Sequence, residues 1–216
     1  MTLAPDINEL LARARADLRI GVPVGLYSEA GSALILPAET ADPERFAALQ
    51  AVGDMSLAIT SRRAETLKAR AYDGDLARIL VPADADLKWI TALADPSGDL
   101  GNPMKGPFRS ERDGSADAHR IALQLTKDAR LLPSALVTDL ENGQDFARAN
   151  QLTAIRADLA KPLLGNATSY QNIVHARLPM DVSEAGQLHV FRPDDGGEEH
   201  YAIIIGAPDR SKPVLT

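Results

Sequence analysis

The sequence contains no cysteine among its 216 residues. Disulfide bonds, thiolate catalysis and cysteine-based zinc sites are therefore excluded within this chain. Aromatic residues make up only 4%, so aliphatic side chains must fill the core, and a stacking platform for single-stranded nucleic acid is not expected. No segment approaches the roughly 20 apolar residues of a membrane span, and residues 1–8 lack a signal-peptide core. These absences predict a cytoplasmic protein that does not enter a membrane.

A basic face is also missing, because the net charge is −7 and the lysines and arginines are scattered. Proteins that bind nucleic-acid phosphates need clustered positive charge, so no nucleic-acid partner is expected. The four histidines, His119, His175, His189 and His200, show no close ligand pairing. The 45% hydrophobic and 25% charged content is that of a globular protein.

Strands alternate with helices over the first 160 residues. Asp6, with Glu9 three residues later, predicts a capping box for a helix over 7–19, which Gly21 ends. Strands are expected over 22–27 and 33–37, and Asp42-Pro43 begins the next helix. Further along, the patterns predict strands over 55–60, 77–81 and 134–138, and helices over 61–70, 84–93, from 115, and along the stripe Phe146, Ala149, Leu152, Ile155 and Leu159.

The pattern changes to hairpins after Gly165. Strands are expected over 187–192 and 200–205, joined by the turn Asp194–Gly197, and Pro213 to Thr216 would start a third. A boundary is therefore placed near 162–172. The sequence predicts an α/β fold, an α+β sandwich over 1–165, followed by a short C-terminal β-hairpin segment over 172–216.

Several segments of the first 165 residues resemble 3,4-dihydroxy-2-butanone 4-phosphate synthase of riboflavin biosynthesis. They are the run Asp17-Leu18-Arg19-Ile20-Gly21-Val22-Pro23-Val24, the run Leu34-Ile35-Leu36-Pro37-Ala38-Glu39, the strand that ends at Thr60, and Leu131-Leu132-Pro133-Ser134-Ala135-Leu136-Val137. The resemblance implies the fold of that family.

The catalytic parts of the synthases do not carry over. Their acidic, magnesium-binding loop corresponds to Ser28–Ala33 here, which holds one carboxylate, Glu29. Their Gly-His-Thr-Glu motif falls at residues 117–120, with Ala118 at the histidine position; a slip of one residue would bring His119 into register. A late glutamate of the family falls at Asp139. His119 and Asp139 are either a remnant metal site or an exposed helix-start histidine and a strand-end aspartate, and no catalytic, cofactor or metal residue is assigned.

Two other groups of polar residues have two interpretations each. Lys105, Arg109 and Arg112 lie in the Gly- and Pro-rich stretch 95–114, which is either a phosphate-binding loop or a solvated linker. The acidic residues Asp194, Asp195, Glu198 and Glu199 suggest a cation site or a solvated turn. His200 is interpreted as structural.

The stretch from Ala176-Arg177-Leu178-Pro179 to Thr216 resembles the opening of the GTP cyclohydrolase II domain. In that family a Pro-Val-Leu segment, here Pro213-Val214-Leu215, precedes an Arg-x-His-Ser-Glu-Cys motif with the first zinc cysteine. The sequence stops before that motif. The resemblance thus implies that the zinc, the GTP contacts and the nucleophile belong to residues outside this chain, which itself binds no cofactor.

The first hypothesis is therefore a non-catalytic scaffold or regulatory region of a GTP cyclohydrolase II, homodimeric through its first domain as synthases of this fold commonly are. GTP would be bound only where the missing catalytic part is present. The alternative is a free-standing homologue that binds a partner or a metabolite as a regulator. A third possibility is a magnesium-dependent synthase with a rebuilt site.

Overall fold

The computed structural model describes residues 3–101, 103–165, 169–181, 183–193, 197–207, 209 and 211. The chain divides into two compact units, Met1–Gly165 and Asn166–Thr216. Each unit is described by itself.

Unit 1 is built on a six-stranded mixed sheet with the strand order β4-β3-β5-β2-β1-β6. The strands are β1 (Val24–Ser28), β2 (Gly31–Pro37), β3 (Met55–Thr60), β4 (Leu76–Leu80), β5 (Ser134–Leu140) and β6 (Ala154–Arg156). All neighbours are antiparallel except β1 and β6, which are parallel.

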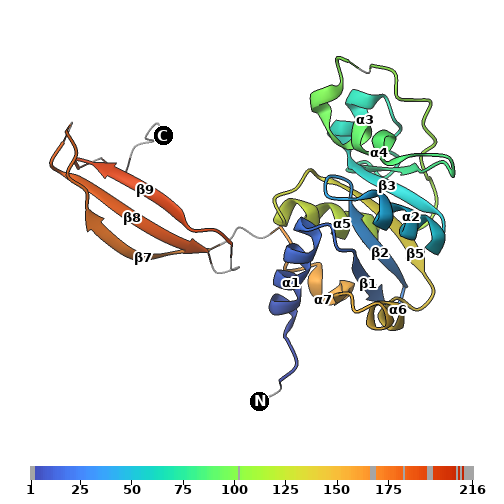
Figure 1. Cartoon of the computed structure of the whole chain (residues 1–216), viewed down its shortest axis with the longest axis horizontal. Coiled ribbons are helices and arrows are strands. Elements are labelled where there is room, and N and C mark those ends of the chain that lie inside the picture. The colour runs from blue at the N-terminus through green and yellow to red at the C-terminus, as the bar shows by residue number, and fades with distance from the viewer. Residues whose placement is uncertain are drawn as a thin grey trace. The chain divides into compact units, whose positions relative to one another are not determined.

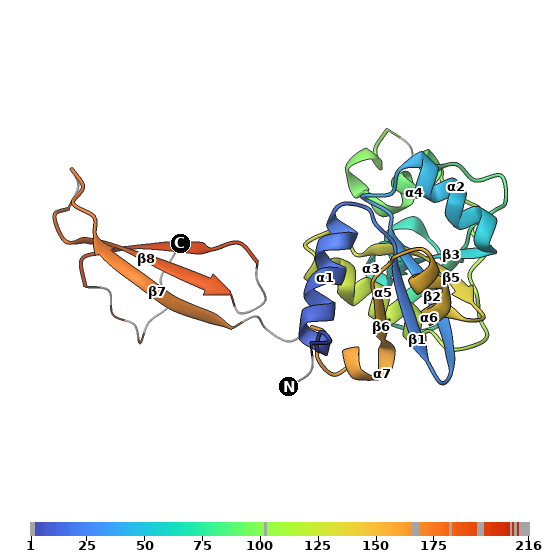
Figure 2. The same ribbon diagram turned by 60° about the horizontal axis from the view of Figure 1, so that its bottom comes forward.

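Helices cover both faces of this sheet (Figures 1 and 2). One face packs against α1 (Ile7–Arg19), α5 (Asp117–Asp128) and α7 (Ala157–Ala160); the other packs against α2 (Pro43–Val52), α3 (Ser61–Leu67), α4 (Leu87–Ala94) and α6 (Gly143–Ala149). Two apolar clusters, one on each face, make up the core. The expected α/β sandwich is thereby confirmed. None of the helices in the described part of the chain is long and apolar enough to cross a membrane.

Local signals place the first helices where the sequence predicts them. The Asp6 side chain accepts a hydrogen bond from the Glu9 amide at 2.9 Å, and the Glu9 carboxylate accepts one from the Asp6 amide, which completes the capping box. Gly21 follows the helix with a φ of +74°, a conformation that glycine adopts without strain. Asp42 caps α2, with Pro43 as its first residue.

The expected helix along the Phe146–Leu159 stripe is wrong. Gln151, with a φ of +57°, lies beyond the end of α6, and Ala154–Arg156 then forms β6, which pairs in parallel with β1. Ile155 is buried because it faces the core from a strand, whereas Ala149 and Leu159 are exposed. The apolar residues of α6, β6 and α7 happen to be spaced three or four positions apart, and this spacing imitates that of one continuous helix.

Unit 2 is an antiparallel sheet of three strands in the order β7-β8-β9. These are β7 (Tyr170–Arg177), β8 (Gly186–Pro193) and β9 (His200–Ile205). The C-terminal hairpin is confirmed as β8 and β9, but the sequence pattern missed β7, whose pairing with β8 is irregular between Asn172 and Val174. Asp194, Asp195 and Gly196 of the expected turn, and Pro213 to Thr216, lie outside the described residues.

Candidate functional site

A cavity of about 560 Å³ lies in unit 1, where the turn between β1 and β2 meets the first turn of α5. Its polar lining consists of Tyr27, Ser28, Ser32, Ser115, Asp117, Asp139, Asp158 and Lys161. The rest is apolar and comes from residues such as Leu26, Ala33, Ala118 and Ile121. This combination of an apolar wall with a few polar groups is typical of small-molecule sites.

Three segments that are distant in sequence meet at this cavity because of the strand order. A tight turn joins β1 to β2, and Ser28 Oγ closes it with hydrogen bonds of 3.2 Å to Gly31 and Ala30. Asp139 at the end of β5 is paired in register with Ala33 of β2, so the carboxylate lies beside the turn. The three segments that the sequence matched to the synthases' catalytic parts therefore share one cavity.

Ala118, not His119, faces this cavity. His119 points to β3 instead, where its Nε2 lies 2.7 Å from Ser56 Oγ, and the residue is only 5% exposed. Ala118 is therefore the residue of this segment that lines the cavity, and the interpretation of His119 as an exposed residue is wrong. Asp139 is exposed and lines the cavity without His119, so the two are not brought together as a metal site there.

Burial determines the chemistry of His119. Desolvation, helped by the positive charge of Arg78, lowers the pKa of the imidazole to about 4, so it is neutral at pH 7. Its Nδ1 is buried and has no hydrogen-bond partner among the described residues. Arg78 is itself buried and bonded to the Asp73 carboxylate at 2.9 Å.

Two of the three aspartates around the cavity are paired with cations of the same chain. Lys161 Nζ lies 3.0 Å from Asp117, and its hydrogen bond lowers the pKa of that carboxyl. Arg156 lies 2.5 Å from Asp158 and lowers the pKa of Asp158 in the same way. Asp139 has no such pair with any described residue, and Glu29 in the turn does not line the cavity. Over the described ranges, no three histidine, aspartate or glutamate side chains are grouped so that they could hold a metal ion.

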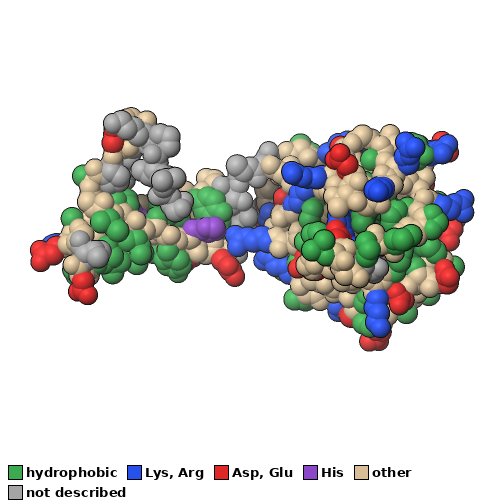
Figure 3. Space-filling model, turned by 90° about the horizontal axis from the view of Figure 1, so that it is seen from above, with side chains coloured by type: hydrophobic (Ala, Val, Ile, Leu, Met, Phe, Trp, Pro, Cys, Tyr) green, Lys and Arg blue, Asp and Glu red, His purple; other side chains and the backbone are tan. Residues whose placement is uncertain are grey.

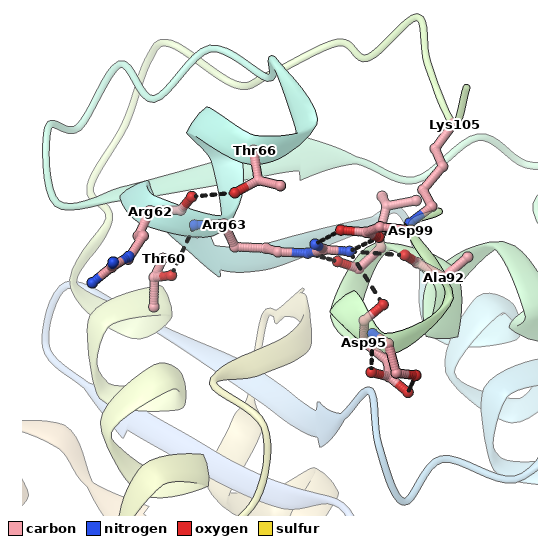
Figure 4. Close-up of polar contacts among 10 residues, drawn as sticks. Thr60, Arg62, Arg63, Thr66, Ala92, Asp95, Asp99 and Lys105 are labelled. Atoms are coloured by element: carbon pink, nitrogen blue, oxygen red, sulfur yellow. Dashed lines mark hydrogen bonds and ion pairs between the residues drawn. The ribbon is translucent and has the colours of Figure 1, made fainter. Parts of the chain in front are cut away.

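The basic residues of the 95–114 stretch have three different environments. Lys105 is buried against the Asp99 carboxylate, which also accepts hydrogen bonds from Arg63 at 2.5 and 2.9 Å (Figure 4). Arg109 is exposed, and the guanidinium of Arg112 lies 4.7 Å from the Tyr72 ring centroid. The interpretation as a solvated linker is therefore wrong for Lys105. The three basic side chains do not converge on one point, so their arrangement does not support a phosphate-binding loop.

Hydrogen bonds of Arg63 hold the 95–114 stretch against the rest of unit 1. The Arg63 guanidinium also donates to the main-chain oxygens of Ala92, Leu93 and Asp95 at the end of α4, at 2.7 to 3.2 Å (Figure 4). Hydrogen bonds from Arg63 and Lys105 hold the pKa of Asp99 well below its usual range. Apart from the short 3-10 helix Pro96–Gly98, the stretch is irregular as expected, and its end adds to the edge of β4 through Leu80 and Arg109.

The sequence reasoning missed Lys161 and Asp158 because it assigned their segment to a longer helix. The signal for Asp158 was the opposite charge of Arg156 two residues earlier, whereas Asp117, the partner of Lys161, lies 44 positions away. In unit 2, His200 lies in β9 with its ring edge-on to Tyr170 at 4.8 Å, and Glu199 forms an ion pair with Arg192 at 2.7 Å. Of the acidic patch, Asp194 and Asp195 lie outside the described residues.

Comparison with known proteins agrees with the motifs. No protein-family model matches the chain. A GTP cyclohydrolase-2 of Azospirillum brasilense is 29% identical over 213 residues, which cover 94% of this chain, and the chain spans only 55% of that relative's length.

Solved structures give the fold. A two-domain 3,4-dihydroxy-2-butanone 4-phosphate synthase from A. baumannii matches 91% of this chain and 70% of its own with a TM-score of 0.54 and 16% identity. A cation-free form of such a synthase matches 70% of this chain and 94% of its own with a TM-score of 0.54 and 15% identity. The chain thus has the fold of the 3,4-dihydroxy-2-butanone 4-phosphate synthases and is similar in sequence to a GTP cyclohydrolase II, as its motifs indicate.

Proposed function

We propose that this chain is a non-catalytic scaffold or regulatory region of a GTP cyclohydrolase II-type protein of riboflavin biosynthesis. Sequence similarity to a GTP cyclohydrolase-2 over 94% of the chain, combined with a synthase fold, supports this assignment. Fold alone does not carry an activity, so the residues of the cavity decide which function fits.

The observation that carries the proposal is the state of the carboxylates around the cavity. Magnesium needs several hard oxygen ligands that converge, and a paired carboxylate is a poor ligand because its cation must first be displaced. Asp117 and Asp158 are paired with Lys161 and Arg156, and Ala118, which the gap-free alignment puts at the synthases' histidine position, lines the cavity. With Asp139 as its one available carboxylate ligand here, a magnesium ion would be coordinated almost wholly by water. We therefore infer that the synthase reaction does not occur here.

The GTP ring-opening reaction is assigned to polypeptide outside these 216 residues. The zinc chemistry of GTP cyclohydrolase II requires cysteine ligands, and this chain has none. In such a protein, unit 1 would act as a folded platform in the cytoplasm. We further propose that two copies associate through unit 1, with no nucleic-acid partner.

A second candidate, a regulator that binds a metabolite, is favoured by the cavity itself. The cavity of about 560 Å³ is large enough for a small molecule, and its apolar wall could bind one without a metal ion. A ligand held there could affect the polypeptide to which unit 1 is attached. Thermal unfolding in the presence of ribulose 5-phosphate and of GTP, each without metal, is the first screen for this candidate.

The direct experiment is an assay of ribulose 5-phosphate consumption with magnesium at high protein concentration. We expect no turnover above a protein-free control, while an active synthase under the same conditions consumes the substrate. Magnesium-dependent turnover that disappears in Asp139→Asn would reject the non-catalytic assignment. Asp145→Asn, on the exposed surface of α6, is the matched control.

A further inference from the structure

The sheet of unit 2 presents an apolar face that no described element of unit 2 covers. The strand register places alternate residues of the three strands on this side, with Val190 opposite both Val174 and Tyr201, and Leu188 opposite both Ala176 and Ile203. The apolar face consists of Val174, Ala176, Leu188, Val190, Tyr201, Ile203 and Ile205.

These side chains are unusually open to solvent for residues of their type. Val174 is 53% exposed, and Tyr201, Ile203 and Ile205 are 64%, 55% and 56% exposed. The nearby charges, Arg192 and Glu199, are paired with each other. Figure 3 shows hydrophobic side chains gathered over unit 2 with few charged groups among them. Contiguous apolar surface of this kind marks an interaction site, because burying it is favourable.

The opposite face of the same sheet is mixed. It carries the polar side chains of His175, Arg177, Gln187 and His189, with the imidazoles of His175 and His189 stacked 5.4 Å apart, and the half-buried apolar side chains of Phe191, Ala202 and Ile204. An antiparallel sheet normally packs its more apolar side against a core and leaves the other in water. The described residues of unit 2 form no second layer that could supply that core, and no residue of the apolar face is fully buried.

We propose that this apolar face docks the cyclohydrolase-type polypeptide that the proposed function requires, so this inference rests on that function. The match to the GTP cyclohydrolase-2 covers 94% of the 216 residues, more than unit 1 contains, so it extends into unit 2. The match to the two-domain synthase covers 91% of this chain, so it also extends into unit 2. Both proteins are longer than the matched part, which is 55% and 70% of their lengths. Proteins that share unit 2 thus carry additional polypeptide that could cover its apolar face.

The partner's chemistry follows from the face. The partner's contact surface is aliphatic and aromatic, and it brings no unpaired charge to the centre of the interface. It covers three strands over about six residues each, an area of roughly 14 by 20 Å. A face of that size is at the small end for a separate interface, which suits a layer of a shared domain core better than a transient contact.

The test uses the full 216-residue chain, tagged and co-expressed with the part of the A. brasilense GTP cyclohydrolase-2 that this chain does not match. Ile203→Glu places a charge on the apolar face, within β9. Gln187→Glu adds the same charge at an exposed position of the opposite face and is the matched control. Circular dichroism checks that each variant is folded, and Ile205→Glu replaces Ile203→Glu if that variant is not.

We expect a 1:1 complex with the wild-type chain and with Gln187→Glu, and binding at least tenfold weaker with Ile203→Glu. Failure of the wild-type chain to form the complex, or equal binding by Ile203→Glu, would overturn the proposal. So would a homodimer of the wild-type chain that Ile203→Glu disperses, because a second copy would then occupy the face. GTP ring opening is assayed separately: a complex without turnover contradicts the proposed function and leaves the docking site intact.

Discussion

The buried imidazole of His119 links the stability of unit 1 to pH. Its pKa is lowered to about 4 in the folded protein, whereas an unfolded chain has a histidine pKa near 6.5. Between those values the unfolded state binds the proton and the folded state does not, so acid favours unfolding. The full stability is present above about pH 6.5 and falls as the pH drops toward 4. Arg78, Arg120 and Asp73 are the charges that act on the ring.

We predict that His119→Gln, which can keep a hydrogen bond to Ser56, flattens this dependence. The wild-type chain should lose up to about 3 kcal/mol of unfolding free energy from this group between pH 6.5 and 4. Urea unfolding of unit 1 at several pH values measures this loss of unfolding free energy. His175→Gln, in the other unit, should behave like the wild type. A His119→Gln profile as steep as the wild-type profile would contradict the assignment.

Asp99 is the second residue whose environment has a measurable consequence. The side chains of Arg63 and Lys105 are 11% and 4% exposed and both depend on this carboxylate. Asp99→Asn would leave two nearly buried cations without a counter-charge, at a cost of about 1–3 kcal/mol. We also expect faster proteolysis within residues 95–105.

Urea unfolding at pH 7 and timed digestion test this prediction. Asp145→Asn is the control, because the Asp145–Arg148 pair is about three-quarters exposed and should change stability by less than about 0.5 kcal/mol. Unchanged stability and digestion in Asp99→Asn would show that the cluster does not hold the loop.

At the scale of elements, the end of α1 depends on Gly21. A Cβ at this position would lie 2.2 Å from the main-chain oxygen of Thr40, and the φ of +74° disfavours any other residue. Thr40 also donates its hydroxyl to the Leu18 carbonyl at 2.7 Å, so displacing it would disturb the helix end. Gly21→Ala should cost about 2 kcal/mol or more. Gly98→Ala, where the Cβ meets open space, should have little effect in the same thermal unfolding experiment.

Elements with strong local signals were predictable. The capping box of α1 and the Asp-Pro start of α2 depend on residues within one turn, and both are present. β6 was missed because it is held by pairing with β1, far along the chain, rather than by its own pattern. β7 pairs with the next strand, β8, and its register is irregular between Asn172 and Val174.

For the whole molecule, the two units should differ in local stability. Strands β3 and β5 are buried on both faces of the sheet in unit 1, whereas β7 is exposed along its whole length. Low burial lowers the free energy of local opening. Hydrogen exchange of the chain alone should therefore be faster in residues 170–177 and 200–205 than in 55–60 and 134–140. Equal protection in both units would indicate that the apolar face is already covered.

The order of the main helices and strands up to α6, the two units' different character and the likeness to two families followed from the sequence, because caps, turns and motif segments are local. The state of the candidate site did not. That Ala118 faces the cavity while His119 is buried, and that Lys161 is paired with Asp117, depends on which helix turn meets which strand. The Ser56–His119 and Asp117–Lys161 contacts join residues 63 and 44 positions apart, and no local pattern encodes them. Only the tertiary structure, which sets burial and the distances between charges, decided them.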